Sequence, residues 1–177
     1  RLSEDHGVTW TNIGPGGSPA FSPFSTSLSS QGNYDQTISY WPGFPDICVL
    51  GGIDQYQWTK TPGSSPTFGG WQQISLWSAH PSSPNYIHAD NHEMKFNSIG
   101  QYFYGNDGGV GSQNFAFYPS NRGYNVTQFY SVAHDRNGAV MGGAQDNGTL
   151  YNDYTLSSTQ QFREVMGGDG FDCDISH

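Results

Sequence analysis

The chain has 177 residues, including 24 glycines and 10 prolines, with 15% aromatic and 12% charged side chains. This composition is typical of a turn-rich β protein, and no sustained helical pattern of apolar residues is present. The formal net charge of −9, with six basic residues, argues against nucleic-acid binding, and no apolar run is long enough to span a membrane. We expect one all-β domain over residues 1–177, with almost no helix.

The first element, SEDHGVTW at residues 3–10, is a densely specified turn. Asp5 is expected to accept backbone N–H bonds within its own hairpin, Gly7 to supply a positive φ, and Trp10 to cover the turn with apolar area. The pattern Ser-x-Asp-x-Gly-x-Thr-Trp resembles the Asp-box, a repeat found in sialidases, sortilin-like receptors and related β-propellers. Its matching residues are Ser3, Asp5, Gly7, Thr9 and Trp10. Because such turns occur in enzymes, receptors and scaffolds alike, the resemblance implies a fold and no particular activity.

A connection rich in Gly, Ser and Pro occupies residues 14–33. After it, one sequence motif recurs three times: an apolar strand, a glycine step, an acidic residue and a tight turn. The aligned acids are Asp54, Asp107 and Asp146. The last two lie 39 residues apart, close to the roughly 40 to 45 residues of a four-stranded propeller blade. The longer first interval contains Pro and Ser-rich stretches that act as loop insertions. The repeat therefore predicts blades.

Each repeat divides into four short strands. We expect strands at 36–41, 46–52, 55–60 and 70–77, then at 92–97, 101–106, 109–114 and 124–130, then at 131–135, 139–145, 149–153 and 161–166. The pairs Asp107-Gly108 and Asn147-Gly148 predict type I′ hairpin turns, which need two residues at positive φ.

The two ends of the chain fall inside predicted blades. Residues 1–33 would hold the end of one blade and the connection, residues 34–79, 80–130 and 131–168 three complete blades, and residues 169–177 the start of the next. We therefore expect a fragment of a larger β-propeller, with the rest of that propeller among its partners.

A second resemblance covers residues 86–176, about half of the chain. The segments HADNHEMKF, YFYGNDGGVGSQ, MGGAQDNGTLY and MGGDGFDCDIS are similar to the propeller region of large secreted proteins of the Bacteroidetes type, often described as sialidase-like or glycosyl-hydrolase-like. This resemblance implies an extracellular or cell-surface location, further domains in the parent protein, and a glycan or a surface protein as partner.

In a propeller, the turns between second and third strands share one face with the connections from fourth to first strands. We call the residues predicted for this face the acidic rim: Asp54, His88, Asp90, His92, Glu93, Asp107, Gln145, Asp146 and Asp169. Converging carboxylates repel one another unless a cation, a proton or a polyhydroxy ligand compensates. The acidic rim therefore predicts binding of a glycan, a cation or a protein.

Within the acidic rim, His88, Asp90 and His92 alternate, so an extended strand would point all three side chains to one side. This arrangement suits a divalent metal, the one cofactor that the sequence suggests, or a proton-transfer pair. The alternative is that His88 and Asp90 cap a loop while His92 packs at the channel. Asp107, Asp146 and Asp169 likewise lie where a turn alone would explain them.

Three classes of function follow from this pattern. We favour a binding module, because most identifiable residues explain turns and strands. A glycoside hydrolase would need two carboxylates, about 5 to 5.5 Å apart for retention or 6.5 to 9.5 Å apart for inversion, drawn from Asp90, Asp107, Asp146 and Asp169. A sortilin-like peptide receptor is the third class. Sialidase activity is not expected, because its arginine cluster is not visible among the four arginines of the chain.

The tryptophans and cysteines are expected to be structural. Trp41, Trp58, Trp71 and Trp77 are assigned to packing between blades rather than to sugar platforms. Cys48 and Cys173 lie in apolar, strand-like contexts and are interpreted as free thiols, since a disulfide needs Cα atoms within about 7 Å.

Overall fold

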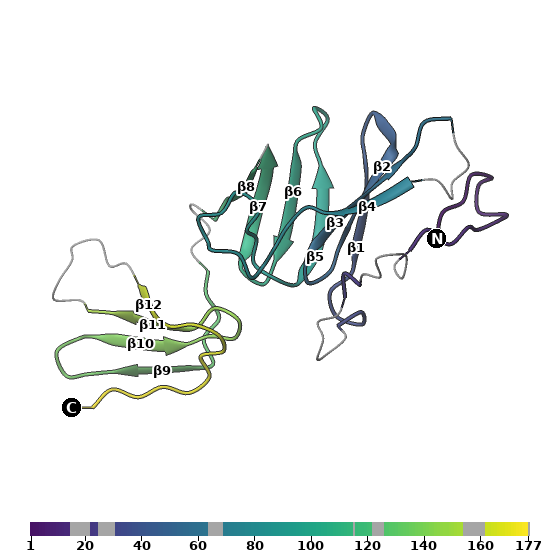
Figure 1. Ribbon diagram of the computed structural model, residues 1–177. Coiled ribbons are helices and arrows are strands. Elements are labelled where there is room, and N and C mark those ends of the chain that lie inside the picture. Colours follow the sequence, from purple (N-terminus) through teal and green to yellow (C-terminus); the bar gives the residue numbers. More distant parts are fainter. Residues whose placement is uncertain are drawn as a thin grey trace. The chain divides into compact units, whose positions relative to one another are not determined.

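The computed structural model describes residues 1–14, 22–24, 31–63, 69–114, 116–121, 126–153 and 162–176. These residues form twelve β-strands and no helix, so none of them belongs to a helix that could cross a membrane. The strands make three four-stranded antiparallel sheets, each built from four consecutive strands (Figure 1). The all-β prediction is confirmed.

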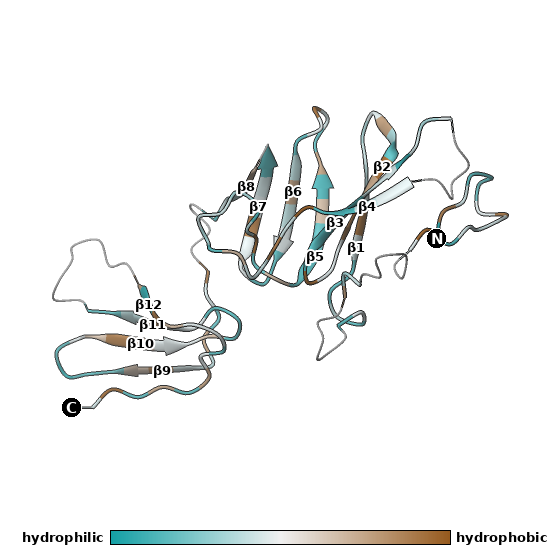
Figure 2. Ribbon diagram, in the orientation of Figure 1, coloured by the Kyte–Doolittle hydropathy of each residue, from teal (hydrophilic) through white to brown (hydrophobic). Residues whose placement is uncertain are grey.

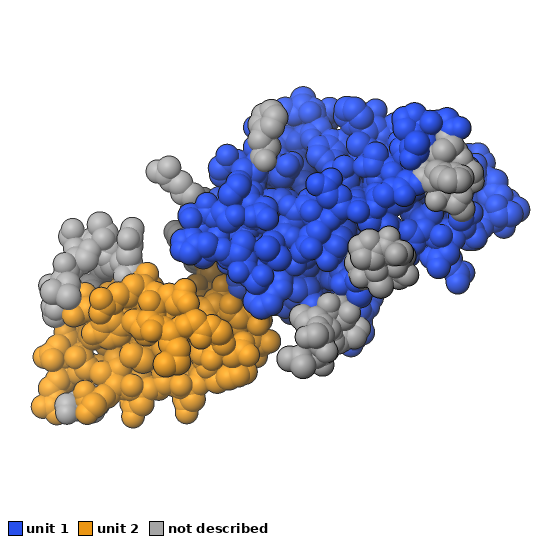
Figure 3. Space-filling model, in the orientation of Figure 1, with its two compact units in different colours: residues 1–121 blue, residues 122–177 orange. Residues whose placement is uncertain are grey.

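The chain forms two compact units, residues 1–121 and residues 122–177 (Figure 3). We call them the first unit and the second unit. The first unit holds the first two sheets and the second unit holds the third sheet. Apolar residues are distributed among all three sheets rather than concentrated in one stretch (Figure 2).

The first sheet follows the predicted strand positions closely. Its strands are β1 (Thr37–Trp41), β2 (Phe44–Gly51), β3 (Gln55–Lys60) and β4 (Gly69–Gln73). The fourth strand ends earlier than predicted, because the chain leaves the ladder at Ile74, whose N–H group still bonds the carbonyl oxygen of Gln55 at 2.9 Å. Val49 and Trp58 turn their side chains into the interior, with exposed fractions of 0% and 4%.

The second sheet contains β5 (Asn91–Phe96), β6 (Tyr102–Asn106), β7 (Gly109–Asn114) and β8 (Ala116–Pro119). The predicted fourth strand at 124–130 is wrong: residues 126–130 lie in no strand, and residues 124 and 125 lie outside the described residues. The physical reason is Phe117 of β8, which packs edge-on against Tyr104 at a ring distance of 5.6 Å. This contact buries a side chain of the short β8. The Thr-Gln-Phe-Tyr stretch at residues 127–130 supplies no buried side chain to this sheet.

The third sheet contains β9 (Ser131–His134), β10 (Val140–Gly143), β11 (Thr149–Asn152) and β12 (Arg163–Met166), at the predicted positions. Residues 167–176 form no strand, although we expected them to begin one. They are held by single contacts instead: the Gly170 N–H group bonds the carbonyl oxygen of Ala144 at 2.8 Å. The Cys173 thiol lies 3.7 Å from the carbonyl oxygen of Ser131 in β9.

The hydrophobic core of the first unit lies between its two sheets. Its buried members are Val49, Ile87, Met94, Tyr102, Tyr104 and Phe117. Beside them, Phe96 stacks on Tyr102 with ring centroids 5.0 Å apart, and Trp41 tilts against Phe96 at the same distance. Trp41 therefore packs against the core between the two sheets of the first unit. Burial of these large rings contributes to the apolar area that joins the two sheets.

A buried polar network crosses the same interface. Gln55 of β3 is fully buried, donates to Asn91 Oδ1 at 2.7 Å and accepts the hydroxyl hydrogen of Tyr102. Asn91 in turn donates to the carbonyl oxygen of Gly52 at 2.8 Å. Because buried polar groups are costly unless paired, these bonds fix the β2–β3 turn against the start of β5.

The opening turn is a closed hairpin. Leu2 and Thr11 exchange two backbone hydrogen bonds of 2.8 Å. Asp5 accepts the Thr9 N–H group at 2.8 Å, and Gly7 has a φ of 90°, the two features that we expected of these residues. Bonds from Thr9 and Ser3 lower the pKa of Asp5 to about 2. Trp10 donates its indole N–H to the carbonyl oxygen of Gly7 at 3.0 Å.

The turn types differ from the prediction. Asp107-Gly108 joins β6 to β7, but the left-handed φ of 115° belongs to the following Gly109, so a type I′ turn is wrong here. Asn121 imposes this shape by accepting the Val110 N–H group and donating to the carbonyl oxygen of Gly108.

The turn after β10 also differs. Asn147-Gly148 lies in a five-residue connection, 144–148, between β10 and β11. The left-handed residues there are Asp146 and Gly148, at φ values of 59° and 73°, so the type I′ prediction is wrong at this site too. A bond of 3.0 Å from the Ala144 N–H group to the carbonyl oxygen of Gly148 closes the longer loop.

Both cysteines are free thiols and half-buried, which agrees with their interpretation from the sequence. Burial raises the pKa of the Cys48 thiol.

Candidate functional site

Two segments of the acidic rim meet at one edge of the second sheet. His92 lies next to the first residue of β5, and its Nε2 atom is 2.6 Å from Oδ1 of Asp107 in the β6–β7 turn. Tyr34 donates its hydroxyl hydrogen to the other oxygen, Asp107 Oδ2, at 2.9 Å. The Tyr34 ring also meets the His92 ring edge-on at 4.9 Å. Both oxygens of the Asp107 carboxylate are therefore held in place.

Asp90 brings a second carboxylate to this edge. One of its oxygens lies within 4.8 Å of a carboxylate oxygen of Asp107, and Oδ1 accepts the side-chain N–H of Gln31 at 2.9 Å. Asp90 has a left-handed φ of 65°, which few residues other than glycine adopt. Strain of this kind is characteristic of positions where a side chain must point in one direction.

Asp35 is a third acid at this site, and sequence reasoning missed it. Its side chain is fully buried, and neither carboxylate oxygen has a hydrogen-bond partner among the residues that the structure describes. Burial, together with the charges of Asp90 and Asp107, raises its pKa to about 6, although His92 acts in the opposite direction. We call Asp35, Asp90, His92 and Asp107 the acidic cluster.

The extended strand predicted for residues 88–92 is wrong. β5 begins only at Asn91, and the left-handed Asp90 turns the chain just before it. His88 therefore lies in the loop, where its carbonyl oxygen accepts a bond from Asn106 Nδ2 at 2.9 Å. Its side chain packs so closely on Gly108 that a Cβ there would lie 2.5 Å from His88 Cβ. His88, a candidate metal ligand from the sequence, packs against this turn.

Two more members of the acidic rim in the first unit have structural partners. Asp54 is 7% exposed and accepts bonds from Gln73, Ser75 and the Trp77 N–H group at 2.8 to 3.1 Å. Burial raises the pKa of Asp54. These bonds tie the β2–β3 turn to the chain that follows β4.

Glu93 lies beside His92 in β5 but forms an ion pair of 2.9 Å with Lys95, and both side chains are exposed. The Lys95 ammonium lowers the pKa of Glu93. Exposed pairs of this kind contribute little to stability. Glu93 therefore has a surface role in this structure.

In the second unit, the residues predicted for the acidic rim also come together. The Asp146 N–H group donates to Asp169 Oδ1 at 3.0 Å, and Gln145 accepts the hydroxyl hydrogen of Tyr130. The first contact connects the β10–β11 loop to the segment that follows β12, and the second connects it to the residue before β9. Asp169 thus stabilises a turn, which was the alternative interpretation of the sequence GGDG.

The acidic cluster offers oxygen ligands for a hard cation. Carboxylates are the groups that Ca²⁺ prefers, at distances of 2.3 to 2.6 Å. Those of Asp90 and Asp107 come within 4.8 Å of each other, and the Asp35 carboxyl is near enough to feel both charges. A buried carboxylate without a partner is costly, and either protonation or a bound cation compensates for that cost. Comparison with known proteins adds no relative: no family model, no curated protein and no solved structure matches the chain.

Proposed function

We propose that the chain is a binding module of a secreted or cell-surface β-propeller, and that its acidic cluster holds a divalent cation, most suitably Ca²⁺. The bound cation then presents open coordination positions to a glycan or protein ligand. The propeller part of this proposal is supported by three successive four-stranded antiparallel sheets and by the packing of β1 beside β5, both first strands of their sheets. In propellers such strands line the central channel.

The observation that carries the cation proposal is Asp35. A fully buried carboxylate with two unpartnered oxygens, close enough to Asp90 and Asp107 for their charges to raise its pKa, is unfavourable in the metal-free protein. A divalent cation would remove that cost, because opposite charge favours the ionised form of all three acids. His92 and Tyr34 orient the Asp107 carboxylate, whose oxygen comes within 4.8 Å of an Asp90 oxygen, so Asp90 and Asp107 are ligands together with Asp35.

The test is calcium binding to the whole chain, measured by calorimetry and by thermal unfolding in EDTA and in Ca²⁺. We expect stabilisation that reaches about 2.7 kcal/mol at a hundredfold excess over Kd. Asp35→Asn should abolish it. The matched control is Asp46→Asn, which removes an exposed carboxylate from β2 of the same unit. No stabilisation by millimolar Ca²⁺, or equal loss in both variants, would contradict the proposal.

A glycoside hydrolase is the second candidate, favoured by one observation. Asp35, with a pKa raised to about 6, keeps its proton to a higher pH than an ordinary carboxyl group, as the general acid of a glycoside hydrolase does. The complete burial of Asp35 places its carboxyl group out of reach of a sugar, so a binding module remains the preferred function. If the wild-type chain hydrolyses a polysaccharide and Asp35→Asn does not, at an unchanged melting temperature, the hydrolase becomes the preferred function.

A further inference from the structure

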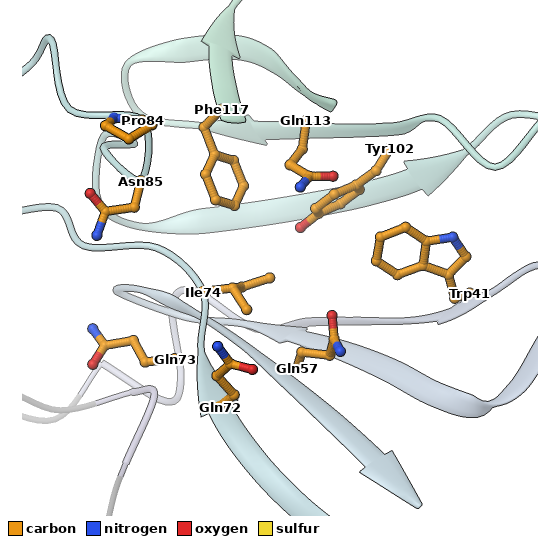
Figure 4. Close-up of a pocket in the computed structure, with 10 residues that line it drawn as sticks. All are labelled: Trp41, Gln57, Gln72, Gln73, Ile74, Pro84, Asn85, Tyr102, Gln113 and Phe117. Carbon is orange, nitrogen blue, oxygen red and sulfur yellow. The ribbon is translucent and has the colours of Figure 1, made fainter. Parts of the chain in front are cut away.

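A groove runs between the two sheets of the first unit, at the end of the sheets away from the β6–β7 turn. One part of it is a cleft of about 400 Å³. In Figure 4, Tyr102, Gln113 and Phe117 line one side and Gln57, Gln72 and Gln73 the other, with Trp41 at one end. This volume lies within the range of sites for small organic ligands.

The groove continues past Trp41. A second hollow of about 480 Å³ shares Trp41 and Gln113 with the first and extends over the β5–β6 turn at Ile99 and Gly100. The two hollows therefore form one elongated groove, with the indole of Trp41 near its middle. An elongated shape suits a chain-like ligand better than a compact one.

The lining of the groove is neutral. Among the described residues that line either hollow, none is Asp, Glu, Lys or Arg, although the chain carries a net charge of −9. The polar side chains are mostly amides instead, from Gln57, Gln72, Gln73, Asn85, Gln101, Gln113 and Asn114. A neutral lining gives a charged ligand no partner to replace its lost hydration.

Many of these amide groups remain available for a ligand. Gln72 and Gln113 make no side-chain hydrogen bond to any described residue. Gln73 uses only its N–H group, on Asp54, and Asn85 uses only its oxygen, on Ser83. The groove therefore presents donors and acceptors together, and the Trp41 indole N–H adds another donor without a partner among the described residues.

We infer that this groove binds a neutral oligosaccharide. Each sugar hydroxyl is both a donor and an acceptor, and a side-chain amide supplies the matching pair of groups. The apolar face of a sugar ring packs on an aromatic side chain, which the half-buried Trp41 provides where the two hollows adjoin. This site is distinct from the acidic cluster, because it lies at the β5–β6 end of the second sheet and contains none of the cluster residues.

The inference is tested with the whole chain on a panel of soluble polysaccharides in EDTA. The panel contains neutral β-glucans, xylans and mannans, and anionic pectin and hyaluronan as comparison. We expect at least one neutral polysaccharide to retard the chain in affinity electrophoresis, and calorimetry with its oligosaccharides to give a Kd. Because EDTA removes divalent cations, failure of the calcium proposal and failure of this one are separable.

Variants locate the binding. Gln72→Ala and Gln113→Ala should each weaken it about five- to tenfold, the effect of one lost hydrogen bond, and Trp41→Phe should also weaken it. The matched control is Gln128→Ala, which removes an exposed amide in the second unit. Since Gln72 is exposed, its variant is expected to fold normally. Retention of anionic polysaccharides alone, retention of none, or equal binding by Gln72→Ala and wild type would overturn the inference.

Discussion

His92 and Asp107 are joined by a contact of 2.6 Å that ties the beginning of β5 to the β6–β7 turn. The contact holds a loop acid in a fixed position before any ligand arrives. Preorganisation of this kind lowers the cost of assembling a binding site. The chemistry of the acidic cluster therefore depends on residues that do not themselves contact the cation, and Tyr34 is the clearest of these.

Tyr34→Phe should weaken calcium binding about tenfold while leaving the fold intact. The substitution keeps the ring that packs on His92 but removes the hydroxyl that donates to Asp107 Oδ2. Hydrogen-bond partners behind a metal ligand typically change affinity by 10 to 100-fold. Calorimetry measures the change. Tyr40→Phe, an exposed residue of β1, is the control, and equal affinity in both variants would show that Tyr34 does not position Asp107.

Asp35 predicts a distinctive dependence of stability on pH. Its pKa is about 6 in the folded chain and near 3.8 when unfolded, so the folded state binds more protons between these values. The free energy of unfolding should therefore fall as pH rises from about 4 to 6 in EDTA. Asp35→Asn should remove this fall and stabilise the metal-free chain by about 1 to 2 kcal/mol at pH 7. Urea unfolding at several pH values measures both effects.

A rise in stability over that window, or a destabilised Asp35→Asn variant, would show that the carboxylate has a favourable partner. Calcium should reverse the order of stability of the wild type and Asp35→Asn. At pH 7 and saturating Ca²⁺, we expect wild type to gain stability and Asp35→Asn to gain none, because the variant lacks the ionised ligand.

The positions of most strands could be predicted because alternation and turn residues are local signals. The apolar strand and glycine step before Asp54 and Asp107 located β2 and β6. The fourth strand of the second sheet could not be found in this way, because β8 is chosen by a tertiary contact between Phe117 and Tyr104. Local β-propensity favoured residues 124–130 instead.

The candidate site could likewise be predicted only in part from the sequence. The sequence predicts His92 and Asp107 on the same face of the fold, among the other residues of the acidic rim, but it does not predict that these two residues pair. The burial of Asp35 could not be predicted from the sequence, because the surrounding Asn, Tyr and Gln residues indicate an ordinary surface loop. The carboxylate is buried only in the folded chain. The amide groove was missed for a related reason: its residues come from many separate strands and loops.

Tyr102→Phe should destabilise the chain by about 1 to 3 kcal/mol although it preserves the aromatic core. The lost hydroxyl donates to Gln55, whose side chain is fully buried and bridges to Asn91. Removing it leaves the Gln55 oxygen without a partner in the interior, which costs more than the bond itself contributes. Urea unfolding measures the loss. Tyr118→Phe, at an exposed position of β8, should change stability by less than about 0.5 kcal/mol, and similar losses in both would contradict a role for the network.

The opening hairpin should loosen in acid because it depends on the ionised form of Asp5. The pKa of Asp5 is lowered from 3.8 to about 2 by bonds from Thr9 and Ser3, so its contribution is present above pH 4 and is lost as pH falls through 2. Asp5→Ala should remove the acceptor of the Thr9 N–H group and speed hydrogen exchange at that amide about fivefold at pH 5. Glu4→Gln is the control, because Glu4 pairs with Lys60 outside the turn. If the Thr9 amide exchanges equally in wild type and Asp5→Ala, the turn is held by the Leu2–Thr11 bridge and not by its acid.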